Sequence, residues 1–114
     1  MAIVNITVEN DADFYRLFQY QTVEGDPLDI TGGTMHMMLR RRAEDDVALM
    51  RLGTNTGEIV LVDPAQGKFS VRIAQAELER LGLGEYEHSL ILTQAGFKRS
   101  IWTGLFTNNA GPSR

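Results

Sequence analysis

The segment from Phe69 to Leu92 reads FSVRIAQAELERLGLGEYEHSLIL and contains both of the patterns that decide the fold. At its two ends apolar and polar residues alternate, which is the period of a strand that is buried on one face. Between these ends, residues 75–81 are good helix formers that place Leu78 and Leu81 on one face. Gly82 follows as a helix-ending glycine. The segment therefore predicts two strands joined by one short crossover helix, at about 75–81.

The period of two recurs along most of the chain. We expect strands at residues 3–8, 14–23, 35–40, 47–52, 59–62, 69–73, 86–92 and 97–107, separated by turns rich in glycine, proline and aspartate. About seven or eight short strands with one helix predict an all-β fold, an antiparallel immunoglobulin-like β-sandwich. Residues 1–108 are expected to form this single domain, with 109–114 as a flexible C-terminal end.

Composition excludes several classes of function. The 114 residues are 43% hydrophobic and 23% charged, as in an ordinary folded domain. Eleven Lys and Arg against fifteen Asp and Glu give a net charge of −4, so we expect no nucleic-acid partner. The sequence contains no cysteine, hence no disulfide. It has no signal-peptide pattern and no apolar run of membrane-spanning length, so we expect a protein made in the cytoplasm, without membrane insertion.

The residues that could carry chemistry form no recognisable catalytic or metal-binding pattern. His36 and His88 are the only histidines, and they lack the spacing that places two imidazoles on one metal. Residues 10–13, Asn-Asp-Ala-Asp, begin like a calcium loop, but its later glycine and glutamate are missing, so we interpret them as a solvated turn. We expect no metal, no cofactor and no enzymatic activity, and we expect His88 to be a hydrogen-bonded, partly buried strand histidine.

Two surface features are candidates for a protein contact. Arg40 and Arg42 could hold an acidic partner or a sugar, or they could close a solvated hairpin beside the acids at 44–46. Residues 101–106 are apolar on both faces of the last strand, and alternation places Ile101 and Leu105 on one of them. If the short helix does not cover that face, a second copy of the chain would. The sequence therefore predicts a homo-oligomer with the last strand in the contact.

Several turn motifs occur in the order found in one family. They are DADF at 11–14, GDPLDITG at 25–32, VDPAQGKFSVRI at 62–73, AQAELERLGLGEYEHSLIL at 74–92 and GLFTNN at 104–109. From about Asp11 to Asn108 the chain resembles small phage and prophage structural proteins, similar to the immunoglobulin-like N-terminal domain of baseplate upper proteins. The resemblance implies a non-enzymatic tail or baseplate assembly module of a virion, with other tail proteins as partners.

The motif at 25–32 has a structural rather than a catalytic interpretation. Its candidate turn residues are Gly25, Pro27, Asp29, Thr31 and Gly32. Pro27 fixes one backbone angle, Asp29 can accept backbone N–H groups, and Gly32 allows the chain to bend. The alternative function is a sandwich that binds carbohydrate or a host surface, with Trp102, Tyr15, Tyr20 and Tyr86 as stacking rings. A small hydrolase is a third, weaker possibility.

Overall fold

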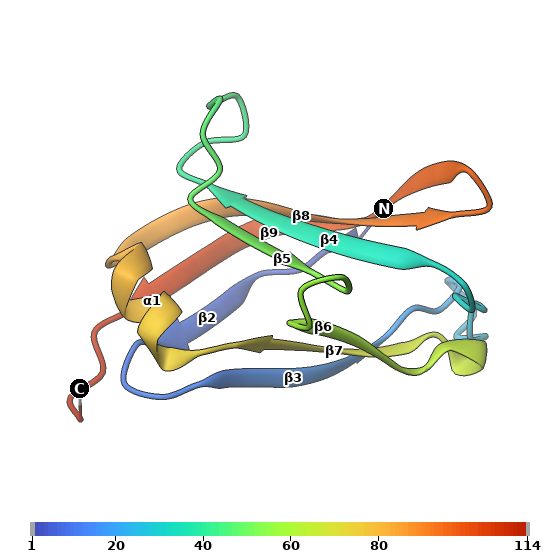
Figure 1. Ribbon diagram of the computed structural model, residues 1–114, viewed down its shortest axis with the longest axis horizontal. Helices are drawn as coiled ribbons and strands as arrows, with labels where there is room; N and C mark the ends of the chain where they lie inside the picture. Colours follow the sequence, from blue (N-terminus) through green and yellow to red (C-terminus); the bar gives the residue numbers. More distant parts are fainter. Residues whose placement is uncertain (1, 114) are drawn as a thin grey trace.

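The alternating segments form two β-sheets packed face to face, as the computed structural model shows for residues 2–113 (Figure 1). Sheet A has the order β1-β9-β8-β4-β5, and β2 also pairs with β9. Its strands are β1 (Ala2–Ile3), β2 (Ile6–Glu9), β4 (Thr34–Arg40), β5 (Met50–Gly53), β8 (Gly84–Gln94) and β9 (Phe97–Asn109). Sheet B has the order β3-β7-β6, with β3 (Phe14–Gln19), β6 (Ile59–Asp63) and β7 (Lys68–Ile73).

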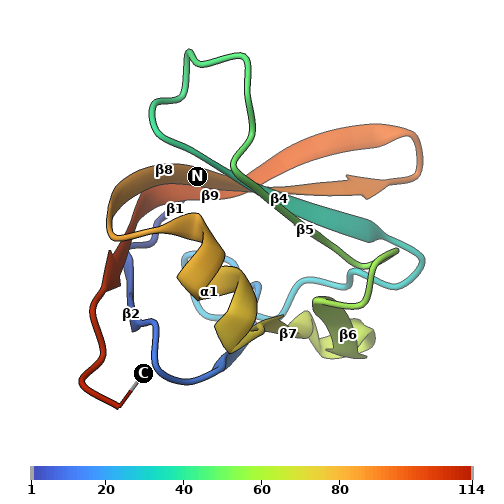
Figure 2. The ribbon, with the colours of Figure 1, turned by 60° about the vertical axis from the view of Figure 1, so that its left-hand side comes forward.

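This strand order is that of an immunoglobulin domain. The neighbours β9, β8, β4 and β5 correspond to strands G, F, C and C′ of a variable-type domain, and β3, β7 and β6 correspond to strands B, E and D. The prediction of an immunoglobulin-like all-β sandwich is thereby confirmed. The helix α1 (Gln75–Leu81) has the predicted bounds, crosses from sheet B to sheet A, and lies at one end between them (Figure 2).

The N-terminal segment corrects the expectation of a purely antiparallel sandwich. The strand predicted at 3–8 is divided into β1 and β2, and both run parallel to β9. A Cβ on Gly104 would collide with the carbonyl of Val4, so β9 has a glycine where the N-terminal chain passes closest. The side chain of Asn5 accepts the N–H of Leu105 at 3.0 Å. Sheet A is therefore mixed, because its N-terminal edge is parallel.

The ends of several other strands differ from the predicted ones, mostly because the predicted strand continues into residues that form a loop. β3 ends at Gln19 rather than residue 23, because the Tyr20 N–H and C=O already bind Gly67 and Leu28. β5 begins at Met50 rather than 47, and β9 continues to Asn109. A 3-10 turn, η1 (Pro64–Gln66), joins β6 to β7. The flexibility of 109–114 stays a prediction, although the Gly111 N–H donates to Asn10 Oδ1 at 3.0 Å.

The core lies between the sheets and has an aromatic centre. The ring of Phe18 from sheet B lies 4.7 Å from that of Trp102 in sheet A and 5.6 Å from that of Phe69. Around this centre, buried aliphatic and methionine side chains such as Met37, Leu90 and Val71 fill most of the space between the sheets. Burial of this apolar surface is the main driving force for the sandwich. No helix within the described residues is long and apolar enough to cross a membrane.

A buried tyrosine fixes the corner where the chain passes from sheet B to sheet A. The hydroxyl of Tyr86, at the start of β8, lies 2.8 Å from the carbonyl oxygens of both Leu81 and Gly82. This is the tyrosine corner of immunoglobulin-like folds. The side chain of Asn108 donates to the carbonyls of Leu78 at 2.7 Å and Gly82 at 3.0 Å. These two side chains satisfy carbonyls at the end of α1 that have no partner within the helix.

The other end of α1 is capped from a distant loop. Ala74 at the N-cap position has no side-chain acceptor, and Asp13 Oδ1 accepts the Gln75 N–H at 2.7 Å instead. The other carboxylate oxygen of Asp13 lies 3.6 Å from the Arg72 guanidinium. The turn at 10–13, interpreted from sequence as merely solvated, therefore attaches the helix to the start of β3.

Tyr86→Phe should destabilise the protein by about 1–3 kcal/mol, because it leaves the part-buried carbonyl of Leu81 without the donor that the hydroxyl supplies. Urea unfolding measures the loss. Tyr15→Phe is the matched control, since Tyr15 is exposed on β3 and should change stability by less than about 0.5 kcal/mol. Equal stability of both variants would contradict the structural role of the corner.

Candidate functional site

The turn residues predicted from the 25–32 motif form a folded loop between β3 and β4. Gly25 and Gly32 have positive φ angles of 94° and 77°. Leu28 N–H binds Tyr20 O at 3.0 Å, and Pro27 forms a β-bridge with Gln21. The Gly33 N–H closes the second turn on Ile30 O at 3.0 Å. The loop is therefore a structural connection held by hydrogen bonds within itself and to neighbouring segments, including Ile30 N–H to the Pro64 carbonyl at 2.9 Å.

Asp29 forms a hydrogen bond within the loop. Its Oδ1 accepts the Thr31 N–H at 2.8 Å. Hydrogen bonds from the side chain and backbone of Thr31 hold the pKa of Asp29 below its usual range. On the far side, the Gln94 side chain donates to the carbonyls of Asp29 and Thr31 at 3.2 and 3.1 Å, which attaches the loop to β8.

The arginines at 40–42 start a loop that projects from sheet A (Figure 1). The Arg40 guanidinium donates to the carbonyls of Asp45 and Asp46 at 3.3 and 3.1 Å, and the Arg42 N–H donates to Asp45 Oδ2 at 3.1 Å. The Arg41 guanidinium lies 4.5 Å from the centre of the Tyr86 ring. Both Arg40 and Arg42 thus help to close the loop, in agreement with the hairpin interpretation, and their role in an interface stays a prediction.

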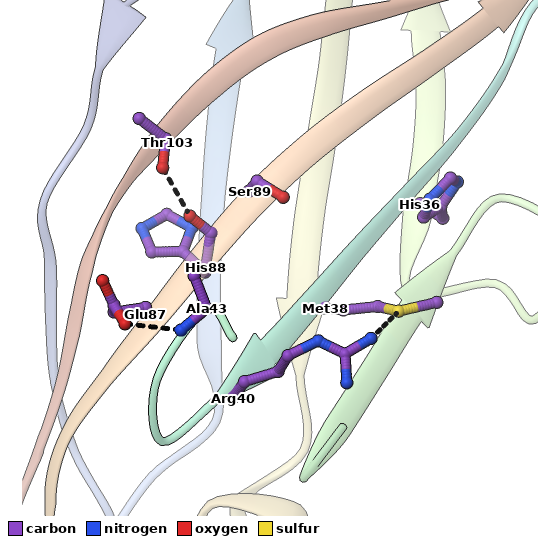
Figure 3. A pocket seen from close by; sticks show the side chains of 8 residues that line it. All are labelled: His36, Met38, Arg40, Ala43, Glu87, His88, Ser89 and Thr103. Atoms are coloured by element: carbon purple, nitrogen blue, oxygen red, sulfur yellow. Dashed lines mark hydrogen bonds between the residues drawn. The ribbon is translucent and has the colours of Figure 1, made fainter. Parts of the chain in front are cut away.

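A pocket of about 230 Å³ lies where this loop meets the outer face of sheet A (Figure 3). Side chains from three strands and the loop line it: His36, Met38, Arg40, Ala43, Glu87, His88, Ser89 and Thr103. Glu87 accepts the Ala43 N–H at 2.6 Å, and Thr103 Oγ1 donates to the His88 carbonyl at 3.2 Å. Its main charged groups therefore hold the loop on the sheet.

Ile101 and Leu105 do not share a face, which corrects the sequence prediction. The pairing of β8 with β9 shifts between Leu90 and Ile91, so Leu90 faces Trp102 while Ile91 faces Ser100. This bulge turns Ile101 inward beside Trp102, leaving it 5% exposed, whereas Leu105 is 42% exposed. The proposed contact on the last strand therefore rests on Leu105, and Ile101 belongs to the core.

The aromatic rings considered for sugar stacking are mostly interior. Trp102 and Tyr86 are buried, Tyr20 is half-buried and Tyr15 alone is exposed. A cleft of about 810 Å³ opens between β1 and the loop after β3, with Phe18, Phe69 and Trp102 in its wall. Because these three rings also form the aromatic centre of the core, their primary role is packing.

His88 is enclosed as expected and has a partner on each ring nitrogen. The Trp102 indole N–H donates to its Nδ1 at 3.2 Å, and its Nε2 lies 2.9 Å from the Val4 carbonyl oxygen. These partners require a neutral ring with its proton on Nε2. Burial lowers the pKa of His88, and the hydrogen bond to Val4 opposes this shift. Within residues 2–113, no group of three His, Asp or Glu side chains could hold a metal ion.

Sequence reasoning missed the roles of the residues around α1. Asp13, Asn10 and Asn108 bind partners that are 62, 101 and 30 residues away in the chain. No local pattern signals such contacts. The tyrosine preceded by Gly84 and Glu85 after a short helix is the one signal that could have indicated a tyrosine corner.

The chain is similar in structure to the N-terminal domain of phage TP901-1 ORF48. The TM-score is 0.56 with 13% identity, and the match covers 93% of this chain and 85% of that one. An identity this low supports a common fold alone. A DUF4784 family protein from Bacteroides caccae (TM-score 0.48, 16% identity, 95% of this chain, 23% of that one) and the Ig1 domain of mouse SynCAM 2 (0.43, 14%, 95%, 93%) are less similar. No family model and no curated protein matches the sequence.

Gly32→Val should lower stability by about 1–2 kcal/mol, because a β-branched residue is strained at φ 77°. Gly32→Asn is the matched control and should lose less, since asparagine tolerates this conformation. Asp29→Ala should lower the thermal midpoint more than Asp26→Ala in the same loop. Unchanged midpoints for Gly32→Val and Asp29→Ala would refute the structural role of the turn.

His88 should make the stability depend on pH. Its folded-state pKa is lower than the usual 6.5, so the unfolded chain binds the proton more readily. The contribution of neutral His88 to the free energy of unfolding is therefore fully present above about pH 6.5 and is lost as the pH falls toward the folded-state pKa. Urea unfolding at several pH values between 7.5 and 5 measures how the free energy of unfolding changes with pH.

His88→Gln should unfold more easily at pH 7.5 and have a flatter slope below pH 6.5 than the parent protein. A His88→Gln protein with the full parent slope would show that another group causes the dependence.

Proposed function

We propose that the chain is a non-enzymatic structural protein of a phage or prophage particle, an assembly module of the tail or baseplate. The observation that carries this proposal is the similarity to the N-terminal domain of phage TP901-1 ORF48, which extends over nearly the whole of both chains. The turn motifs at 25–32 and 62–73 support the same family from the sequence side.

The use of polar groups supports an assembly role over catalysis. Among the side chains that face the pocket on sheet A, Arg40, Glu87 and Thr103 bind the backbone of the loop or of a neighbouring strand. His88, which could have served as a general base, has a partner on both ring nitrogens. A scaffold that positions partners needs such a rigid arrangement and needs no reactive group.

On this proposal the protein is made in the cytoplasm of a bacterial host and resides in the virion with other tail proteins. Binding to carbohydrate has less support, because Trp102 and Tyr86 are interior. A glycan array with the purified protein would detect the alternative function, and we expect no binding.

Particles purified from the producing strain should contain this protein at a fixed copy number relative to the major tail protein. Quantitative mass spectrometry on gradient-purified particles measures the ratio, with an abundant cytosolic host protein as the contamination control. Loss of this protein from particles that retain their other tail proteins would overturn the proposal.

A further inference from the structure

The methionines within residues 2–113 divide into three core residues and one surface residue. Met35, Met37 and Met50 are each 7% exposed or less. Met38 follows Met37 in β4, so the alternation of the strand turns it to the outer face of sheet A. There it is half-buried and lines the pocket of about 230 Å³. Small reagents in solution therefore reach the thioether of Met38 but not those of the core methionines.

The sulfur of Met38 accepts a hydrogen bond from a cation that also holds a loop. Arg40 Nη2 donates to Met38 Sδ at 3.6 Å, a contact drawn in Figure 3. Nη1 of the same guanidinium donates to the carbonyls of Asp45 and Asp46 at 3.3 and 3.1 Å. Arg40 thus links the thioether to residues 41–49, the loop that projects between β4 and β5. Because sulfur is a weak acceptor, the link is weakest at Met38.

We propose that Met38 is a site of oxidation by hydrogen peroxide, and that its sulfoxide strengthens the link through Arg40 to the loop. In the reaction, a lone pair of Sδ attacks one oxygen of hydrogen peroxide, the O–O bond breaks and an S–O bond forms. The thioether loses two electrons and the peroxide gains them. The departing hydroxide takes the proton of the transferred oxygen and leaves as water.

The sulfoxide oxygen of Met38 would have a strong donor within reach. It is bonded to Sδ, which already lies 3.6 Å from Arg40 Nη2, so a small side-chain rotation brings it to hydrogen-bond distance. A hydrogen bond from an ionised donor to oxygen is short and strong. Glu87 faces Arg40 in the register, but its carboxylate accepts the Ala43 N–H and forms no ion pair within the described residues. The guanidinium is therefore available to the sulfoxide.

Oxidation at this position leaves the core of the sandwich intact. The added oxygen on Met38 would enter the surface pocket, whereas one on Met37 would bring a polar group into the core at a cost in stability. The effect is therefore confined to the loop, which carries the side chains of Val47 and Leu49, 67% and 46% exposed. Peroxide would hold this loop more firmly on sheet A, and a methionine sulfoxide reductase would reverse the change. This modification goes beyond the proposed assembly role and is independent of it.

Site-resolved oxidation rates test the first part of the proposal. The purified chain is treated with hydrogen peroxide and digested, and mass spectrometry measures the oxygen gained by each methionine. Met38 should react at least about tenfold faster than Met35, Met37 and Met50, because buried sulfur reacts only when the fold opens. Equal rates for these four residues would overturn the proposal. The measurement needs no variant, so it does not depend on the folding of any mutant.

Hydrogen–deuterium exchange before and after peroxide treatment tests the link to the loop. Amide exchange in residues 41–49 should slow by at least about twofold on oxidation. Treatment with a methionine sulfoxide reductase should restore the original exchange rate. Met38→Leu keeps an apolar side chain of similar size without sulfur, and its loop should not respond to peroxide. Unchanged or faster exchange in the oxidised parent chain would contradict the strengthened link.

Two arginine variants separate the role of Arg40 from that of charge in general. In Arg40→Gln, Met38 should still be oxidised, but exchange in residues 41–49 should no longer slow. Arg51→Gln is the matched control, because Arg51 faces Met38 in the register of β5 while the sulfur contact is made by Arg40. It should keep the parent response. A loop that still slows in Arg40→Gln, or that loses its response in Arg51→Gln, would refute the assigned link.

Discussion

The hydroxyl of Tyr86 makes the contact on which the connection of the two sheets depends. It lies 2.8 Å from two carbonyl oxygens at the end of α1, at the point where the chain leaves sheet B. A short helix at this corner exposes several unpaired carbonyls toward the interior, and burial without a donor would cost free energy. Asn108 satisfies a further one from the last strand. The crossover, the start of β8 and the end of β9 are thus held by one set of hydrogen bonds.

The fold class could be predicted because it depends on local patterns. Alternation along Phe69–Ile73 specifies which side chains enter the core, and a left-handed glycine such as Gly32 marks the turn that precedes β4. The parallel pairing of β1 and β2 with β9 could not be read in this way. It depends on Gly104 meeting Val4, two residues that are a hundred positions apart.

The candidate site was predictable only in part, for the same physical reason. Asp29 acts within its own turn, so its contact with Thr31 follows from spacing alone. Ile101 was assigned to the wrong face because a bulge one residue long inverts the alternation of β9. The bulge is visible only in the pairing of β9 with β8, and strict alternation in one strand contains no sign of it.

The same bulge divides β9 into a segment in which consecutive residues enter the interior and a segment with regular alternation. Before it, Ile101 and Trp102 both enter the interior, and the Trp102 indole fixes His88, which in turn holds Val4. After it, regular alternation resumes, so Phe106 packs inside while Leu105 faces outward beside Glu87. The exposed Leu105 is not part of the core. Its place on the longest and most extensively paired strand gives any contact made there a rigid support, as an assembly module requires.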